Sequence, residues 1–344
     1  MGLHFLVAPD SFKGTFDAAV VAEAIAAGTE DAGGRADPCP VADGGEGTMD
    51  VLLGALGGER RAARVHGPLR RPIEASFGLF ADGETAIVET AQASGLSLLA
   101  PEERDPERAD TYGTGELIAA AIGAGARTVL LAAGGSATTD GGRGAIEALR
   151  QSNAAFVLCS SYAGQRTNAD VTIEVLCDVR TPYEDAARVF APQKGADPAA
   201  VERLASRLDA LAAELPRDPR GIPMSGCAGG LSGGLWAHGA QLRPGADFVL
   251  DALGFDSRLA RVDAVVSGEG RFDSQSLEGK VVGAIAARCA AAGKPLHLIV
   301  GEDALASDLP PAISSIAEAT TLREIERGGR VCAAEDLNRG CPFM

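Results

Sequence analysis

Five stretches of the sequence place glycine or an apolar strand end beside acidic, hydroxyl or lysine residues. They are APDSFKG (8–14), ADGGEGT (42–48), AAGGSATTDGG (132–142), LCDV (176–179) and SGEGRFDSQ (267–275). Each one alone is more typical of a turn, because glycine, aspartate and serine favour turns for local reasons. In open α/β sheets, however, ligands bind beyond the carboxyl ends of the strands. Five such loops in one chain therefore favour a shared site.

Acidic residues stand at the ends of several expected strands: Asp10, Asp43, Asp178, Glu269 and Asp273. Carboxylates in such positions can hold Mg²⁺ or accept a proton from a hydroxyl group. Each one taken singly would equally suit a helix cap or a turn. The acids therefore indicate a metal or proton-transfer site only if the fold brings them together.

Lysine is scarce in this chain, and three of the four lysines follow or precede glycine loops. These three are Lys13, Lys194 in APQKGA and Lys280 in EGK. A compact ammonium beside such a loop can pair with a phosphate or a carboxylate. A solvated surface position is the alternative for each of them.

Two glycine-rich segments are candidates for binding phosphate, GGSATTDGG (134–142) and GCAGGLSGG (226–234). Both lead into apolar segments of helical spacing, and glycine lets backbone N–H groups approach an anion near a helix N-terminus. Close packing of a helix would explain the same glycines, so both interpretations stay open here.

Several well-known patterns are missing. The sequence has no GxxxxGK[ST] loop, no GxGxxG in the glycine segments, no GxSxG elbow directly after an expected strand and no HExxH pair. Their absence disfavours a Walker nucleotide site, a dinucleotide fold, acyl transfer and a zinc centre. Acids, glycines and lysines remain, and this set suits phosphoryl transfer, where catalysis is mostly positioning and charge neutralisation.

The elements that must position these loops alternate between strand and helix at both ends of the chain. The apolar run LHFLVAPD (3–10) precedes a helical pattern, and residues 262–302 repeat a strand–helix–strand order. From about Glu59 the pattern changes to alternation with DG and GP breaks, which predicts antiparallel hairpins. The tail after Arg327 is polar and is expected to be loosely ordered.

This rhythm predicts an α/β protein of two domains, which is also the number that 344 residues favour. Residues 1–60 and 256–344 would form one discontinuous domain around a parallel sheet. Residues 61–255 would form a mixed α/β domain inserted into it.

Composition limits the partners. The formal net charge is −16, which argues against nucleic acid or an anionic membrane as a partner. The seven cysteines contain no CxxC pair and read as reduced thiols. No apolar run is long enough to span a bilayer, and the start of the chain lacks a signal-peptide pattern. We therefore expect a cytoplasmic protein with small-molecule partners, and a homodimer is compatible with the sequence.

The motifs resemble those of the bacterial type I glycerate kinases. APDSFKG, PVADGGEGT, YGTGELI, GGSAT-DGG, CDV followed by FAPQKGA, and SGEGRFDSQ-x-x-x-GK stand in the order found in that family. The likeness extends from about Phe5 to Val300. It implies a discontinuous Rossmann-like domain and a mixed α/β domain, with the site in the cleft between them. It also implies phosphorylation of D-glycerate by ATP with Mg²⁺, typically giving 2-phosphoglycerate.

The resemblance, with our own assignment of roles, divides the candidate residues into four groups. Asp178, Lys13 and Asp10 would be catalytic, with Asp178 as the base and Lys13 on the substrate carboxylate or the transferring phosphate. Substrate would contact Ser11, Asp43, Glu46, Lys194, Thr139 and Thr181. ATP would lie against Gly134, Gly135, Ser136, Asp140, Gly229 and Gly230, and Glu269 and Asp273 would hold the metal.

The chain departs from the family pattern at two of these positions. The family usually has asparagine where this chain has Thr139, and Asn-Pro where it has Thr181-Pro182. A threonine hydroxyl cannot reproduce the donor and acceptor pair of an amide. Either the acceptor is another small hydroxy acid, or the changes are drift within true glycerate kinases.

Two further readings belong to other functional classes. A non-catalytic ATP-binding homologue would keep the fold, although a scaffold alone needs none of these acids and lysines. A dehydrogenase is disfavoured by the missing GxGxxG.

Overall fold

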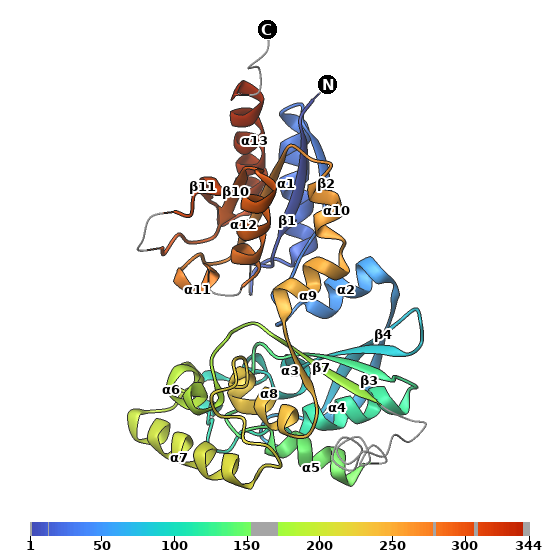
Figure 1. The fold of residues 1–344 in the computed structure, drawn as a ribbon, viewed down its shortest axis with the longest axis vertical. Helices are drawn as coiled ribbons and strands as arrows, with labels where there is room; N and C mark the ends of the chain where they lie inside the picture. The colour runs from blue at the N-terminus through green and yellow to red at the C-terminus, as the bar shows by residue number, and fades with distance from the viewer. Residues whose placement is uncertain (1, 13, 153–170, 278–279, 306–308, 340–344) are drawn as a thin grey trace. The chain divides into compact units, whose positions relative to one another are not determined.

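The computed structural model describes residues 2–12, 14–152, 171–277, 280–305 and 309–339 (Figure 1). The chain forms two compact units, residues 1–43 with 246–344 and residues 44–245. These boundaries differ from the expected ones at 60 and 255. Helix α2 (Thr48–Leu56) packs on strands of the second unit. Helix α9 (Gly245–Ala252) places Ala246 and Leu250 in the core of the first unit.

The first unit contains a five-stranded parallel sheet in the order β11-β10-β9-β1-β2. Its strands are β1 (His4–Pro9), β2 (Arg35–Pro38), β9 (Ala264–Glu269), β10 (Leu296–Val300) and β11 (Ile313–Glu318). The central strands β9 and β10 are buried along their whole length. Such continuous apolar strands are typical of a parallel sheet covered on both faces.

Alternate residues of these strands enter different cores. Leu6 and Ala8 pack with α9, α10 (Phe255–Leu259) and α12 (Val281–Ala292). Phe5 and Val7 pack instead with α1 (Ala18–Asp31) and α13 (Leu322–Arg339). Successive side chains of a strand point to opposite faces. The first unit is therefore a three-layer α/β fold, as the sequence predicted.

The expectation of a loosely ordered tail after Arg327 is wrong for the described residues. Helix α13 extends to Arg339, and its Cys332 and Ala333 are buried against the sheet. His297 of β10 fixes this helix further: its Nδ1 and Nε2 lie 2.8 Å from Ser315 Oγ and Asp336 Oδ2. The polar composition of this segment led to the wrong expectation, because the buried contacts come from only one narrow face of the helix.

The second unit contains a six-stranded mixed sheet in the order β3-β4-β5-β6-β7-β8. Strands β3 (Gly58–His66), β4 (Pro72–Phe80) and β5 (Thr85–Glu89) are antiparallel neighbours, as the alternating pattern predicted. Strands β6 (Thr128–Ala132), β7 (Thr172–Cys177) and β8 (Gln241–Pro244) continue in parallel. The loops after β6 and β7 therefore leave the sheet at the same edge.

Helices and short turns cover this sheet and carry its loops. They are α2, α3 (Thr90–Ser94), α4 (Tyr112–Gly123), α5 (Arg143–Gln151), α6 (Ala186–Phe190), α7 (Pro198–Glu214), α8 (Cys227–Ala237) and the 3-10 turns η1 (Leu96–Leu98), η2 (Pro101–Glu103), η4 (Tyr183–Asp185) and η5 (Pro192–Lys194). The first unit also has the single-turn helix α11 (Ser274–Leu277).

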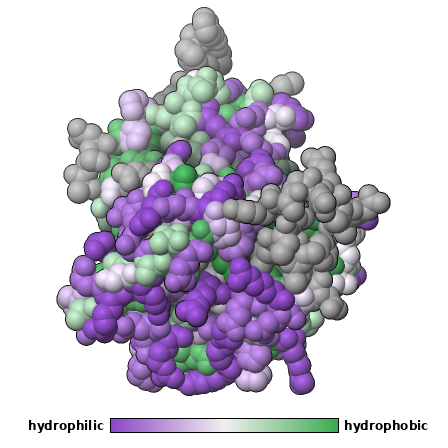
Figure 2. Space-filling view, turned by 60° about the horizontal axis from the view of Figure 1, so that its bottom comes forward, coloured by the Kyte–Doolittle hydropathy of each residue, from purple (hydrophilic) through white to green (hydrophobic). Residues whose placement is uncertain are grey.

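The face drawn in Figure 2 is mostly hydrophilic, with hydrophobic residues in separate small areas. The cysteines of the described residues, Cys39, Cys177, Cys227, Cys289 and Cys332, are free and buried. Among the helices that the structure describes, none is both long and apolar enough to cross a bilayer.

Helices α1 and α13 pack closely because a glycine from each, Gly28 and Gly329, lies in their contact. A Cβ added to Gly28 would lie 1.8 Å from the Glu326 carbonyl oxygen. We predict that Gly28→Ala lowers the free energy of unfolding by about 1–3 kcal/mol, the usual effect of overpacking. Gly54→Ala is the control, since its Cβ would meet nothing within 4 Å in helix α2. Urea titration of both variants tests this, and an equal effect of the two would contradict it.

Candidate active site

In the first unit, a cavity of about 390 Å³ lies at the carboxyl ends of β1, β9 and β10. It brings together four residues that the sequence predicted for the site: Asp10, Ser11, Asp43 and Glu269. Three of the parallel strands thus contribute polar residues at one edge of the sheet, as the rule for open α/β sheets requires.

The carboxylates of this cavity are almost fully buried. Asp10, Asp43 and Glu269 are 5%, 2% and 7% exposed. Asp10 is held by the backbone, since its N–H donates to Gly268 O at 2.8 Å and its Oδ1 accepts from Ser11 N at 2.6 Å. Burying several carboxylates together is costly unless cations or hydrogen bonds compensate. The arrangement therefore suits the binding of a cation.

Two cations line the same cavity, Lys280 and Arg271. Arg271 lies 3.6 Å from Asp273 Oδ2 and 3.4 Å from Glu302 Oε2. Arg271 was not predicted from the sequence, although it stands two residues after Glu269 in the motif SGEGRFDSQ. Lys280 was singled out by its rarity but was not assigned a site role.

One predicted residue of this group, Asp273, is not brought into the cavity, and another, Lys13, lies outside the described residues. Asp273 is not among the lining residues, and its carboxylate faces Arg271. Within the described residues, no group of three or more His, Cys, Asp or Glu side chains has the arrangement of a metal site. Mg²⁺ commonly takes only one or two carboxylates and completes its shell with water and substrate phosphates.

In the second unit, a separate cavity of about 260 Å³ lies at the ends of β6 and β7. Its lining includes five predicted residues: Gly134, Gly135, Ser136, Asp178 and Lys194. Sequence reasoning assigned no role to Phe190 and Gln193, which line it from α6 and η5. Gln193 is part of APQKGA, so the motif itself was the available signal.

Lys194 is the central cation of this cavity and is only 3% exposed. Its Nζ donates to Ser136 Oγ at 2.9 Å and to the Thr138 carbonyl at 2.6 Å. Burial lowers the pKa of the ammonium to about 8, and the charges of Asp140 and Asp178 oppose that decrease. An ammonium carries three donors. The two acceptors found among the described residues leave the third for a ligand.

Tight glycine packing holds the loop around Lys194. A Cβ on Gly134 would lie 2.6 Å from Gly45 Cα and 3.2 Å from Asp178 Oδ2. A Cβ on Gly135 would lie 3.7 Å from Glu46 Oε2, so this exposed carboxylate approaches the loop without lining the cavity. These glycines permit close approach of backbone to the acids.

Gly229 and Gly230 of the second glycine segment do not line the cavity as predicted, whereas Ala228 of the same segment does. Ala228, Gly229 and Gly230 have φ of 52°, 65° and 87°, a left-handed turn inside α8. A Cβ on Gly229 would lie 2.0 Å from the Thr138 carbonyl oxygen, and one on Gly230 would lie 2.8 Å from the Tyr183 ring. Of the two interpretations left open, close packing therefore describes Gly229 and Gly230 better in this structure.

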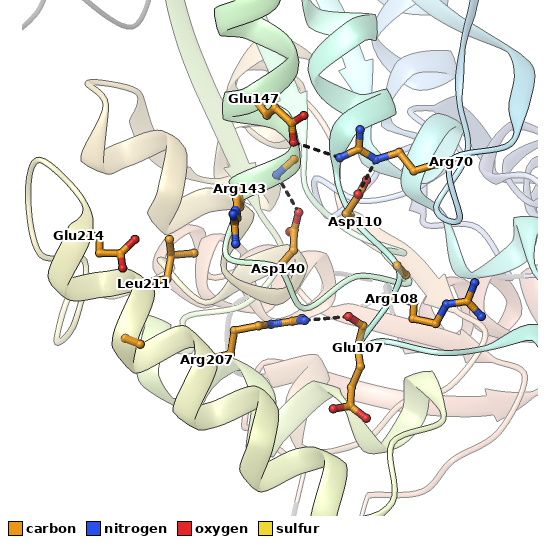
Figure 3. Close-up of a pocket in the computed structure, with 13 residues that line it drawn as sticks. Arg70, Glu107, Arg108, Asp110, Asp140, Arg143, Glu147, Arg207, Leu211 and Glu214 are labelled. Carbon is orange, nitrogen blue, oxygen red and sulfur yellow. Dashed lines mark hydrogen bonds and ion pairs between the residues drawn. The ribbon is translucent and has the colours of Figure 1, made fainter.

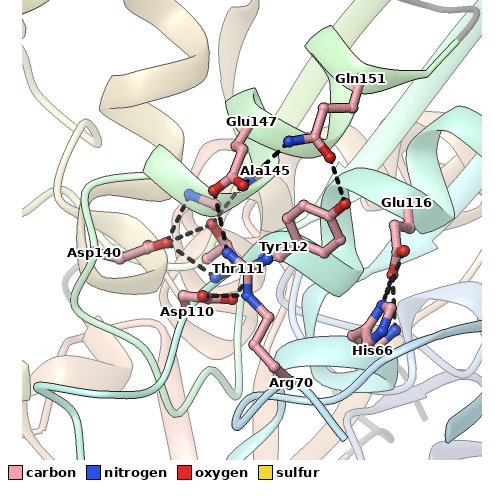
Figure 4. Close-up of polar contacts among 11 residues, drawn as sticks. His66, Arg70, Asp110, Thr111, Tyr112, Glu116, Asp140, Ala145, Glu147 and Gln151 are labelled. Carbon is pink, nitrogen blue, oxygen red and sulfur yellow. Dashed lines mark hydrogen bonds and ion pairs between the residues drawn. The ribbon is translucent and has the colours of Figure 1, made fainter. Parts of the chain in front are cut away.

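Asp140 also has a different position from its predicted partners Gly134 to Ser136. It lines a third cavity (Figure 3), and its carboxylate accepts from Thr111 N, Thr111 Oγ1, Gly142 N and Gly144 N at 2.8–3.1 Å (Figure 4). These bonds join the start of α4 to the start of α5. Asp140 therefore organises the loop by hydrogen bonding, and no part of the Lys194 cavity is lined by it.

The two threonines that depart from the family pattern lie away from the lining of both cavities. Thr139 is fully buried, and its Oγ1 has no hydrogen-bond partner among the described residues. Thr181 contributes its carbonyl to Gly226 N at 2.9 Å. Neither hydroxyl lines the cavity that holds Lys194.

Comparison with known proteins identifies the family. Residues 5–325 match the Glycerate kinase family. The chain belongs to that family. It is 38% identical to glycerate 2-kinase of Escherichia coli K12, over 81% of this chain and 80% of the relative. It is 39% identical to glycerate kinase of Bacillus subtilis 168, over 81% and 79% of the two chains.

The fold is similar to that of a candidate glycerate kinase 2 from Salmonella typhimurium LT2, whose crystal structure superposes with a TM-score of 0.78. The identity is 32%, and the alignment covers 98% of each chain. The two-sheet α/β fold and the resemblance stated from the motifs are confirmed. The protein is a phosphotransferase with an alcohol group as acceptor.

We predict that Gly229→Ala lowers both stability and activity, because the new Cβ would displace the Thr138 carbonyl from Lys194. The expected loss of stability is about 1–3 kcal/mol from overpacking, in addition to about 1–2 kcal/mol for the left-handed backbone. Gly221→Ala is a matched control, since Gly221 has φ of 71° but open space around it. Calorimetry and kcat/KM should separate the two variants, and identical losses would refute the steric explanation.

Proposed function

We propose that the protein transfers a phosphoryl group from ATP, with Mg²⁺, to a hydroxyl group of D-glycerate and releases 2-phosphoglycerate. The observation that carries the proposal is the buried Lys194 ammonium, which lines a small cavity together with Asp178 and Ser136. The names of the relatives in Escherichia coli and Bacillus subtilis support the choice of acceptor, and the former also supports the 2-position.

The cavity of the second unit is assigned to the acceptor. A hydroxy acid has a carboxylate and hydroxyl groups on adjacent carbons. The third donor of Lys194 would pair with the carboxylate, and charge-assisted hydrogen bonds of this kind are the stronger ones. Asp178 lines the same cavity and would accept the proton of the attacking hydroxyl.

The cavity of the first unit is assigned to the phosphates of ATP. Asp10, Asp43 and Glu269 present buried carboxylates, and Lys280 and Arg271 present cations. This donor set fits Mg²⁺, which prefers carboxylate and phosphate oxygens. Bound there, the metal would neutralise charge on the phosphates. Ser11, whose N–H already fixes Asp10, would contact the same group.

The proposal is tested by ADP release with Mg²⁺ and ATP against D-glycerate, L-glycerate and other small hydroxy acids. We expect turnover on D-glycerate at about 1–100 s⁻¹, the usual range for kinases. Activity restricted to another hydroxy acid would show that D-glycerate is not the acceptor. The region around Thr139 and Thr181 would then be the first place to look for the change in specificity. ATP binding without turnover on any acceptor would make this a non-catalytic homologue.

Replacing Lys194 should raise the KM for the acceptor more than it lowers kcat. A hydrogen bond to a charged group contributes about 1.5–3 kcal/mol, which corresponds to a roughly 10- to 150-fold higher KM for Lys194→Met. Lys294→Met is the control, because Lys294 Nζ also donates to a backbone carbonyl, that of Val262, but in the first unit and outside both cavities. Equal kinetics of wild type and Lys194→Met would exclude the assignment.

The pH dependence follows from the same ammonium. Its pKa of about 8 lies below the ordinary value of 10.5, so the charged form needed to bind a carboxylate is lost as the pH rises through about 8. We expect kcat/KM for the acceptor to fall on the alkaline side of that pH. A bound carboxylate stabilises the ammonium, so the alkaline limb of kcat should lie at higher pH. Coincident limbs in kcat and kcat/KM would contradict carboxylate binding at Lys194.

Changes in the first unit should affect the nucleotide rather than the acceptor. Glu269→Gln is expected to raise the KM for Mg·ATP at least about tenfold, because one anionic ligand of the metal is lost. Glu302→Gln is the control: Glu302 lines the same cavity but is exposed and paired with Arg271. Chelation of the metal with EDTA should abolish turnover in all variants. A changed KM for the acceptor alone would reverse the assignment of the two cavities.

A further inference from the structure

A third cavity, of about 410 Å³, lies in the second unit and is used by none of the steps above. Its wall is formed by the first half of α5, the second half of α7 and the segment 107–110, with Arg70 and Asp140 completing it (Figure 3). No lining residue of the Lys194 cavity belongs to it.

Most carboxylates of this wall already have partners within the protein. Arg70 donates to Asp110 at 2.5 Å and to Glu147 at 3.2 Å, and its guanidinium stacks 3.8 Å above the Tyr112 ring (Figure 4). Glu107 accepts two hydrogen bonds from Arg203, at 2.8 and 2.7 Å.

Two carboxylates of the wall form no ion pair with a cation in the part of the chain that the structure describes. Asp140 is satisfied by its four N–H and O–H donors. Glu214 is the exposed last residue of α7, and its carboxylate has no hydrogen bond or ion pair among the described residues. The exposed Glu214 carboxylate is therefore the one carboxylate of the wall, among the described residues, that is left without a hydrogen bond or ion pair.

Among the described residues, no hydrogen bond or ion pair joins a carboxylate to two of the guanidinium groups of the wall, and these two groups extend toward the same space. Figure 3 shows Arg143 entering from α5 and Arg207 from α7. Among the described residues, the Arg207 guanidinium donates to carbonyl oxygens alone, those of Glu107 and Thr139 at 2.7 Å and Pro106 at 3.4 Å. Arg143 donates its backbone N–H to the Asp140 carbonyl at 3.2 Å, whereas its guanidinium has no hydrogen bond or ion pair among the described residues. Arg108, the remaining arginine of the wall, extends away from them in the same view.

The hydrogen bonds that fix Arg207 therefore all go to neutral groups. The pKa of Glu107 is lowered by its hydrogen bonds from Arg203 and, to a smaller extent, by the charge of Arg207, but both hydrogen bonds that this carboxylate accepts come from Arg203. A guanidinium has five N–H donors, of which the carbonyl contacts use part. The remaining donors of Arg207 and the fork of Arg143 match pairs of oxygen atoms on one anion. A phosphate group, with a charge near −2 at neutral pH, can accept from both at once. A single carboxylate would leave one guanidinium unbalanced.

We propose that this cavity is a binding site for the phosphate group of a small phosphorylated molecule, held between Arg143 and Arg207. The volume leaves room for an organic part beside the phosphate, next to Ala210 and Leu211. This site is separate from the two cavities assigned to the transfer reaction, and its test does not depend on that assignment.

Direct titration of the full-length protein with inorganic phosphate, followed by calorimetry at constant ionic strength, tests the proposal. We expect saturable binding that Arg143→Ala and Arg207→Lys each weaken at least about tenfold. The matched control is Arg150→Ala on α5, since Arg150 does not line the cavity. This control should retain the wild-type affinity within about twofold.

Arg143→Ala keeps the test decisive if a change at Arg207 disturbs folding, because Arg143 is exposed and its side chain is bonded to nothing among the described residues. Absence of saturable phosphate binding, or equal binding by wild type and Arg143→Ala, would overturn the proposal. Malonate serves as the dicarboxylate comparison. If malonate binds as tightly as phosphate and in the same Arg143-dependent way, the assignment to phosphate is wrong.

Discussion

A buried ammonium is the constraint around which the second unit is organised. Removing a charge from water costs several kcal/mol unless hydrogen bonds and nearby charges compensate. Lys194 meets this requirement with Ser136 Oγ and the Thr138 carbonyl, and both acceptors belong to the loop after β6. The glycine turn of α8 packs against that same carbonyl. The loop, the helix and the lysine therefore depend on one another for their positions.

The first unit solves the opposite problem, since it gathers buried negative charge. Parallel strands β1 and β9 end side by side: Asp10 directly follows β1, and Glu269 is the last residue of β9. The strand residues that form the two cores are apolar, and the carboxylates of the cavity stand at the strand ends. A sheet that is covered on both faces leaves this edge as the place where a ligand can reach such groups.

Much of this arrangement could be predicted from the sequence, because it follows from strand ends. Apolar runs followed by acids placed Asp10, Glu269 and Asp178 at cavities, and the rarity of lysine selected Lys194 and Lys280. The discontinuous chain path followed from the return of the strand–helix rhythm in the last third. Local patterns also identified the β3–β5 hairpins.

What failed depends on contacts between segments distant in sequence. Asp140 stands in a glycine-rich loop, but its carboxylate accepts hydrogen bonds from Thr111 and from the start of α5. No local sequence pattern reveals these contacts. Gly229 and Gly230 looked like a phosphate cradle, but the Thr138 carbonyl and the Tyr183 ring occupy the space beside them. The last turns of α13 were not predicted, because they are held by a hydrogen bond between Asp336 and the buried His297, which is distant in sequence.

Three consecutive residues of one loop are each bound by a different element: Thr138 by Lys194, Thr139 by Arg207 and Asp140 by Thr111. The first two contacts use carbonyl oxygens, which every amino acid provides. Evolution can therefore replace the side chain at position 139 and leave both contacts intact. An inserted or deleted residue, by contrast, would displace these three residues from their partners. In this loop the first two contacts depend on the spacing of the backbone and not on which side chain stands at position 138 or 139.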